Sequence, residues 1–311
     1  MATPKENASQ PNGAKAGQVT DSRVVISVRD LVVRFEAADG SQSTVLRGVT
    51  FDVYQGETLV IMGGSGCGKS TLLNCLIREI KPAEGTILYN LPDVGEVNLC
   101  QADSKTINRL RMRIGILFQS GALFSSLTVA ENIALPLREH SYVDPAIIDI
   151  VVAMKLQQVQ MLAHRDKLPS QLSGGQKKRA GLARALALDP EVLFYDEPSA
   201  GLDPVRSTTI DELMMDLSQK LQVTSIVVTH EMDSAFRIAD RMVMLHEGRV
   251  LKIGPRAEFE ALRNADPASL ADEDEQIMHQ FLNGSNEGPL TQGEGLDDYE
   301  RILHQTVSRR R

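Results

Sequence analysis

The sequence predicts an α/β fold, in which short buried strands alternate with helices. The first observation is that short apolar runs rich in β-branched residues recur along the chain, as at 58–62 and 225–228. The second is that stretches with helical composition, such as 175–188 and 208–221, lie between such runs. The third is that the run at 58–62 leads into a glycine-rich loop and then a helix-like segment from Lys69, which is how an α/β unit begins.

Strands are expected first near the N-terminus, where 24–35 and 44–54 are rich in β-branched residues. The run at 58–62 is wholly apolar apart from its first residue, which is typical of a short buried strand. Further strands are expected at 114–118, 192–195 and 225–228, with a hairpin formed by 242–245 and 250–253. Helices are expected at 69–80, over most of 126–163, and at 175–188, 208–221 and 271–282.

Charge and composition divide the chain into three segments. The 311 residues carry a formal net charge of −8, which argues against a nucleic-acid binder that relies on phosphate neutralisation. Residues 256–311 hold 12 acidic and 6 basic side chains, so most of the net negative charge lies there. We therefore expect a disordered polar leader at 1–22, a folded domain at 23–255 and an acidic extension at 256–311.

Two further features limit where the protein works. No stretch approaches the roughly 18 apolar residues that a transmembrane helix needs, and the leader has no apolar core like that of a signal peptide. Cys67, Cys75 and Cys100 are few and odd in number, so we expect no disulfide framework and a reducing cytosol as the environment. The cysteines also lack the spacing of a metal site.

A phosphate-binding loop is the strongest motif. The segment fits the pattern G-x-x-x-x-G-K-[ST], whose glycines let backbone N–H groups surround phosphate oxygens. Lys69 should reach the β- and γ-phosphates, and the hydroxyl of Ser70 should bind Mg²⁺. The alternatives, a glycine turn that binds nothing and a nucleophilic Cys67, are less favoured, because Cys67 has no evident base to activate it. The loop residues expected to bind ATP are Gly63, Gly64, Ser65, Gly66, Cys67, Gly68, Lys69, Ser70 and Thr71.

Two adjacent carboxylates end the apolar strand expected at 192–195. Neighbouring residues of a strand point to opposite sides, so Asp196 and Glu197 can have different functions. We expect Asp196 to hold Mg²⁺, directly or through water. Glu197 would be the general base that activates the attacking water, a function worth roughly 10²–10⁴-fold in rate. A solvated strand end is the alternative, and the phosphate loop in the same chain disfavours it.

A third motif identifies the type of ATPase. Residues 172–176 read LSGGQ, with Ser173 placed to cap a helix whose first N–H groups are exposed by glycines. With this motif the sequence resembles the ABC-type ATPases over about 24–255. The other motifs follow in that family's order: Phe35 at the adenine-stacking position (often Tyr in the family), Gln119 in the Q-loop, Asp203 in the D-loop and His230 as the switch histidine.

The resemblance implies a P-loop NTPase fold of the ABC type, which is a RecA-like α/β core with an antiparallel β subdomain and an α-helical subdomain at about 121–172. It also implies a head-to-tail homodimer, because the chain has one phosphate loop and one signature. ATP would lie between Lys69 of one subunit and Ser173, Gly174, Gly175 and Gln176 of the other. The implied catalytic residues are Glu197, His230 and Gln119, and the implied Mg²⁺ ligands are Ser70, Gln119 and Asp196.

Residues 118–140 carry a narrower resemblance. They contain FQSGALF followed by TVAENIALPLRE, and with 229–241, 280–284 and 288–290 they are similar to the ATPase subunits of Mla-type phospholipid transporters. This resemblance implies a separate membrane permease docked on 119–138, a lipid-binding partner of the MCE type, and a peripheral position on the cytoplasmic face of the inner (plasma) membrane. The alternatives are a small-solute importer and a non-transport ABC ATPase that serves cell division or repair.

The acidic extension has two interpretations. It is either a solvated linker, as acidic segments usually are, or a segment that reaches across the dimer. The apolar residues Tyr299, Ile302 and Leu303 would be its anchors in the second case.

Overall fold

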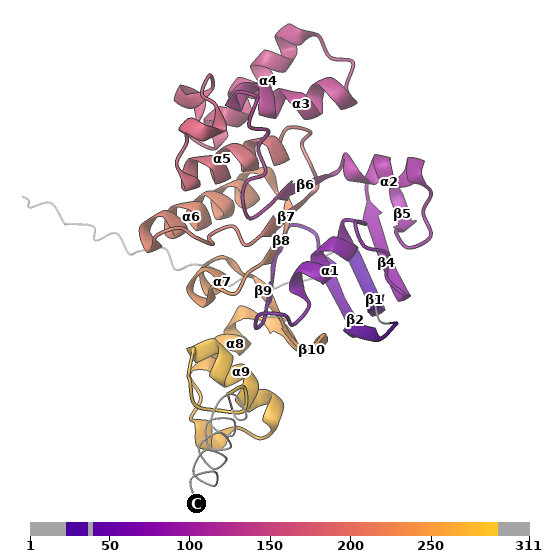
Figure 1. Ribbon diagram of the computed structural model, residues 1–311, viewed down its shortest axis with the longest axis vertical. Helices are drawn as coiled ribbons and strands as arrows, with labels where there is room; N and C mark the ends of the chain where they lie inside the picture. Colours follow the sequence, from indigo (N-terminus) through magenta and orange to yellow (C-terminus); the bar gives the residue numbers. More distant parts are fainter. Residues whose placement is uncertain (1–22, 37–39, 292–311) are drawn as a thin grey trace, which may run out of the picture.

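The computed structural model describes residues 23–36 and 40–291. Two sheets form its centre, with helices α3 and α4 at one end of the molecule and α8 and α9 at the other (Figure 1). The disordered leader predicted at 1–22 and the proposed anchors Tyr299, Ile302 and Leu303 lie outside the described residues. Within the described part, no helix has both the length and the apolar character that crossing a membrane requires.

The first sheet is antiparallel and has the strand order β2-β1-β4-β5. Its long strands place alternate apolar side chains, such as Ile26 and Val28, in the interior, as the period of a strand requires. The ladder between β1 and β2 is interrupted by bulges, which add twist to both strands. The strands are β1 (Val24–Glu36), β2 (Gln42–Tyr54), β4 (Glu84–Leu91) and β5 (Gly95–Asn98).

The second sheet has the order β10-β9-β3-β8-β7-β6, and all neighbours are parallel except the edge pair β9-β10. Every residue of β3 and β8 is buried, as expected for parallel strands covered on both faces. The strands are β3 (Thr58–Met62), β6 (Ile114–Leu117), β7 (Val192–Asp196), β8 (Thr224–Val228), β9 (Arg241–His246) and β10 (Arg249–Pro255).

This parallel sheet separates two hydrophobic cores. Val60 and Met62 pack on one face with helices α3 to α7, whereas Leu59 and Ile61 pack on the other face with α1 and the antiparallel sheet. The two cores therefore follow from the period of two along each strand. The helices are α1 (Lys69–Leu76), α2 (Ser104–Arg111), α3 (Val129–His140), α4 (Pro145–Gln158), α5 (Gly174–Ala185), α6 (Pro204–Leu221), α7 (Met232–Ile238), α8 (Arg256–Arg263) and α9 (Glu273–Asn283).

Most expected elements occur, with shifted ends. Helix α1 stops at Leu76 rather than at 80, because residues 77–80 form turns whose N–H groups bond back to Leu73, Asn74 and Cys75. Helix α6 begins at Pro204 rather than at 208, since Asp203 caps it and proline suits the first helical position. Five of the α-helices and β-strands in the described part were not predicted from the sequence: β4, β5, α2, α7 and α8.

Candidate nucleotide site

The phosphate loop joins the end of β3 to the start of α1, as the sequence predicts. Its backbone depends on glycine at two positions. Gly63 has φ 151°, and a Cβ there would lie 2.2 Å from the carbonyl oxygen of Leu245. Gly68 has φ 107° and caps α1, and a Cβ there would lie 2.7 Å from Cδ2 of Leu46. Other residues would strain this turn, so the loop conformation is built into its glycines.

Lys69 is buried at the base of this loop. Its Nζ donates hydrogen bonds to the carbonyl oxygens of Gly63 at 2.7 Å and Gly64 at 2.9 Å. These bonds hold the ammonium group of Lys69 inside the turn. An anion bound by the loop would lie beside this positive charge. Ser65, Gly66 and Ser70 are exposed, and Thr71 is half-buried in the first turn of α1.

The antiparallel sheet is tied directly to the phosphate loop. Arg47 N donates to Gly248 O at 2.9 Å, and Gly248 N donates to Cys67 O at 3.0 Å. Gly248 has φ 77°, and a Cβ there would lie 2.1 Å from the carbonyl oxygen of Val45, so only glycine fits. The sequence reasoning assigned no site function to Gly248, and its only sequence signal is its place in the turn of the predicted hairpin. Phe35 lies on β1 of the same sheet and is 43% exposed, as an adenine platform would need to be.

Asp196 and Glu197 lie at the carboxyl end of β7. Burial and the neighbouring charge of Glu197 raise the pKa of Asp196, and the ammonium of Lys69 partly offsets this rise. Strands β3, β8 and β7 are parallel neighbours, so the phosphate loop after β3 and the carboxylates after β7 lie at the same edge of the sheet, the usual ligand position in open α/β sheets.

The strand-alternation argument for these two carboxylates was wrong for Glu197. Strand β7 ends at Asp196, and Glu197 lies beyond it with φ 48°, in the left-handed region. Its side-chain direction therefore comes from this backbone turn and not from the pleat of a strand.

Glu197 contacts the histidine that the sequence singles out. Its Oε1 lies 2.8 Å from Nδ1 of His230, and its Oε2 accepts a longer bond of 3.4 Å from His230 N. The side chain of Glu197 is only 13% exposed, whereas that of His230 is 58% exposed. His230 follows β8, which pairs with β7, and Gln119 is an exposed residue shortly after β6, which pairs with β7 on its other side. Strand pairing therefore brings Gln119, Glu197 and His230 to the edge of the parallel sheet where its strands end.

The signature residues lie elsewhere on the chain. Ser173 caps α5 by accepting a bond from Gln176 N, and the side chain of Gln176 accepts one from Ser173 N at 2.9 Å, which forms a capping box. They border a pocket of about 240 Å³ that also contains Gly175 and His164 and no residue of the phosphate loop. Asp203, the D-loop residue, caps α6 and pairs with Arg206 at 3.1 Å. Gly174 is exposed at the start of α5.

The residues present fit a magnesium ion at the edge of the parallel sheet. The pKa of Asp196 is raised by burial and by the charge of Glu197, and a divalent cation would relieve both effects. Ser70, Gln119 and Asp196 offer oxygen donors, which Mg²⁺ prefers, and phosphate and water usually complete its coordination. Among the described residues, no group of three or more His, Cys, Asp or Glu side chains lies close enough together to hold a metal ion.

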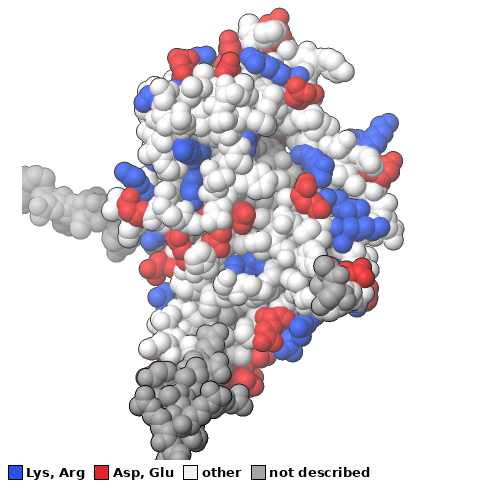
Figure 2. All heavy atoms as spheres, in the orientation of Figure 1, with Lys and Arg blue, Asp and Glu red and all other residues white. Residues whose placement is uncertain are grey.

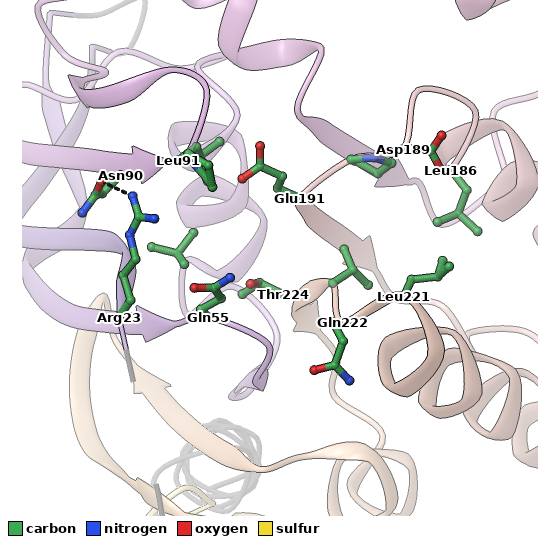
Figure 3. A pocket seen from close by; sticks show the side chains of 14 residues that line it. Arg23, Gln55, Asn90, Leu91, Leu186, Asp189, Glu191, Leu221, Gln222 and Thr224 are labelled. Carbon is green, nitrogen blue, oxygen red and sulfur yellow. Dashed lines mark hydrogen bonds between the residues drawn. The ribbon is translucent and has the colours of Figure 1, made fainter. Parts of the chain in front are cut away.

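The pocket drawn in Figure 3 lies at the opposite edge of the parallel sheet, where β7 and β8 begin. It has a volume of about 250 Å³, and Arg23 donates a bond of 2.6 Å to Asn90 across its wall. Thr224, also in the lining, accepts from Gly56 N at 3.0 Å. None of the predicted site residues lines it, so it is separate from the nucleotide site.

Figure 2 shows acidic and basic side chains interspersed on the face drawn, with uncharged residues between them.

Comparisons with known proteins agree with this geometry. The sequence profile described as ABC transporter matches residues 46–200. A probable ribonucleotide transport ATP-binding protein, mkl of Mycobacterium leprae, is 39% identical over 88% of this chain and 73% of its own length. An intermembrane phospholipid transport system ATP-binding protein, MlaF of Haemophilus influenzae, is 35% identical over 82% of this chain and 90% of its own.

A solved structure gives the same fold. The ATP-binding cassette MJ0796, in a dimeric post-hydrolysis state bound to ADP and Pi, aligns with a TM-score of 0.67 and 28% identity. The alignment covers 74% of this chain and 98% of that one. The predicted ABC-type α/β fold is therefore confirmed, and the chain belongs to the family of ABC transporter ATP-binding proteins, whose activity is ATP hydrolysis.

Proposed function

We propose that two copies of this chain pair head to tail around two ATP molecules and hydrolyse them to power lipid transport. The observation that carries the proposed dimer is that the pocket beside Ser173 contains no residue of the phosphate loop. A site that combines the loop with the signature would therefore use a second copy of the chain. The dimeric state of the related cassette MJ0796 supports this arrangement.

Each site would combine residues of both copies. Lys69 and the loop 63–71 would bind the phosphates, with Phe35 against the adenine. Ser70, Gln119 and Asp196 would hold Mg²⁺, which would neutralise phosphate charge. Glu197 would accept the proton of the attacking water, and His230, bonded to it at 2.8 Å, would keep its carboxylate oriented toward the γ-phosphate. Residues 173–176 and Asp203 would come from the partner.

A groove beside Gln119 supports a permease as the next partner. It has a volume of about 900 Å³, is lined by α2, β6, α3 and α5, and includes Phe118 and Pro136 from the region predicted to dock. Its rim is basic, so an acidic or amphipathic cytoplasmic segment would suit it. The basic lining residues are Lys105, Arg109, Arg111, Arg184 and His140.

Phospholipid is the cargo that the resemblance to Mla-type ATPases favours, and the MlaF relatives are named for its transport. Such a transporter would include an MCE-type lipid-binding protein and would hold this subunit on the cytoplasmic face of the inner membrane. The runner-up is a small-solute transporter, which the name of the mkl relatives, probable ribonucleotide transport, favours.

The test is purification of the tagged full chain from membranes together with its partners, followed by reconstitution in liposomes. We expect a permease to co-purify and ATP hydrolysis to move a labelled phospholipid and not a ribonucleotide. Lys105→Glu in the groove should weaken co-purification, whereas Lys81→Glu, an exposed lysine outside it, should not. ATP-dependent movement of ribonucleotide alone would refute the lipid assignment.

A further inference from the structure

Lys178 is a buried lysine on the helix that begins with the signature motif, and no function above uses it. The residue as a whole is 5% exposed. The ammonium group donates to two main-chain oxygens, that of Glu197 at 3.1 Å and that of Ala200 at 2.8 Å. Across the described residues, no carboxylate forms an ion pair with it. Buried lysines are rare unless paired, so a buried ammonium group that holds carbonyl oxygens needs an explanation.

The two carbonyls belong to the turn that follows β7. Glu197 has φ 48°, and its carbonyl oxygen also accepts a bond of 3.2 Å from Ala200 N. A non-glycine residue in this region is strained and persists only where its surroundings hold it. Val228 O accepts from Glu197 N at 2.9 Å, so Lys178 and Val228 together hold both polar groups of the Glu197 backbone. The direction of the Glu197 side chain depends on these bonds.

Helix α5 connects this turn to the signature. Ser173 and Gly175 at its start are the residues proposed to meet ATP held by the partner, and Lys178 lies one turn further along the same helix. At the start of the helix, a Cβ on Gly174 would lie 3.6 Å from Cδ2 of Leu202, so α5 also packs on the D-loop. One rigid element therefore contacts both the signature surface and the backbone of Glu197.

We propose that Lys178 is a positioning residue for ATP hydrolysis, which holds the backbone of Glu197 and joins it to the helix that meets the ATP of the partner. This inference rests on the proposed dimer and on the proposed function of Glu197 as general base. Its consequence is that each chain couples the two ATP sites: a shift of α5 on contact with one ATP moves the base that acts on the other.

The test compares three variants of the full chain in steady-state ATP hydrolysis. Lys178→Met removes the three donors but keeps most of the unbranched side chain, and should lower kcat roughly 10- to 100-fold, the cost of a misplaced catalytic group. The KM for ATP should change little, because the phosphate loop is untouched, and the Hill coefficient should fall toward one. Lys178→Arg should restore most of kcat, since its guanidinium group can donate to both carbonyls. Lys177→Met, the neighbouring lysine, should match the wild type.

If Lys178 only stabilised the fold, the kcat of its variants would behave differently. Normal kcat in folded Lys178→Met, or a kcat that falls only with the folded fraction, would overturn the inference. Should Lys178→Met fail to fold, the pH profile decides. Burial lowers the pKa of Lys178, and the carboxylates of Glu231 and Glu197 offset only part of this effect. The wild type should therefore lose kcat at a lower alkaline pH than Lys178→Arg, and coincident alkaline limbs would refute the inference. Glu197→Gln separates this inference from the proposed function of Glu197. A normal rate of ATP hydrolysis in Glu197→Gln would refute Glu197 as the general base. An inactive Glu197→Gln together with a normal Lys178→Met would refute only the function of Lys178.

Discussion

Replacement of Glu197 by glutamine isolates the chemistry of one carboxylate. The main-chain bonds of Glu197 to Val228, Ala200 and Lys178 do not involve its side chain, so the variant retains them. Within the described part of the chain, the carboxylate of Glu197 bonds only to His230, with Nδ1 at 2.8 Å, and an amide of the same shape can still bond there. Because His230 is more than half exposed, the loss in folding free energy should be at most about 1 kcal/mol.

The expected loss in rate is much larger. A general base contributes about 10²–10⁴-fold, which corresponds to about 2.7–5.5 kcal/mol in the activation free energy. Glu197→Gln should therefore bind ATP with nearly unchanged affinity, stop turnover and accumulate as an ATP-bound dimer. Phosphate release measures kcat, and size-exclusion chromatography with light scattering measures the dimer with and without ATP.

A matched control lies at the other end of the same strand. Glu191→Gln alters a half-buried carboxylate just before β7, remote from the phosphate loop, and should leave kcat unchanged. Normal hydrolysis by Glu197→Gln would refute the assignment of this residue as the base. A monomeric ATP-bound form of the variant would refute the sandwich arrangement.

Three further outcomes follow from the contacts described above. Lys69→Ala should lose ATP binding or hydrolysis, measured with a fluorescent ATP analogue and by phosphate release, and unchanged activity would contradict the function of the loop. Burial raises the pKa of the Cys67 thiol, so maleimide labelling should be slow near neutral pH, accelerate as the pH rises and be blocked by ATP; labelling insensitive to ATP would contradict its position. Asn132→Ala should lower the free energy of unfolding by about 1–3 kcal/mol in denaturant melts, because buried Asn132 satisfies polar groups of Phe124, Leu127 and Thr128; an unchanged midpoint would contradict this.

The motifs could be predicted from the sequence because each is a continuous segment, and the phosphate loop and the acidic pair also follow strands. The loop at 63–71 and the pair Asp196 and Glu197 follow apolar runs that signal β3 and β7, and parallel strands bring their carboxyl ends to one edge. The missed strand β4 had a signal of its own, the β-prone residues 86–89. Helix α7 has only seven residues, too few for a periodic pattern to be recognised.

Other features depend on contacts that sequence patterns do not contain. The left-handed backbone of Glu197 arises from the turn after β7, and no single-residue preference predicts it. Lys178 would be assigned to a solvated helix face from its residue type, but tertiary packing buries it against residues 19 and 22 positions further along the chain. Asn132 similarly gains its partners only when the segment before α3 folds over it.

The most direct test of the shared site mixes two inactive variants. One chain carries Lys69→Ala, which disables the phosphate loop, and the other carries Ser173→Arg, which blocks the signature. In a mixed head-to-tail dimer, one site combines both defects and the other site has none. Because about half of the dimers in an equal mixture are mixed, and each has one intact site of two, mixing should restore up to about a quarter of the wild-type ATPase rate. A mixture as inactive as either variant alone, or full activity of Ser173→Arg by itself, would contradict the account.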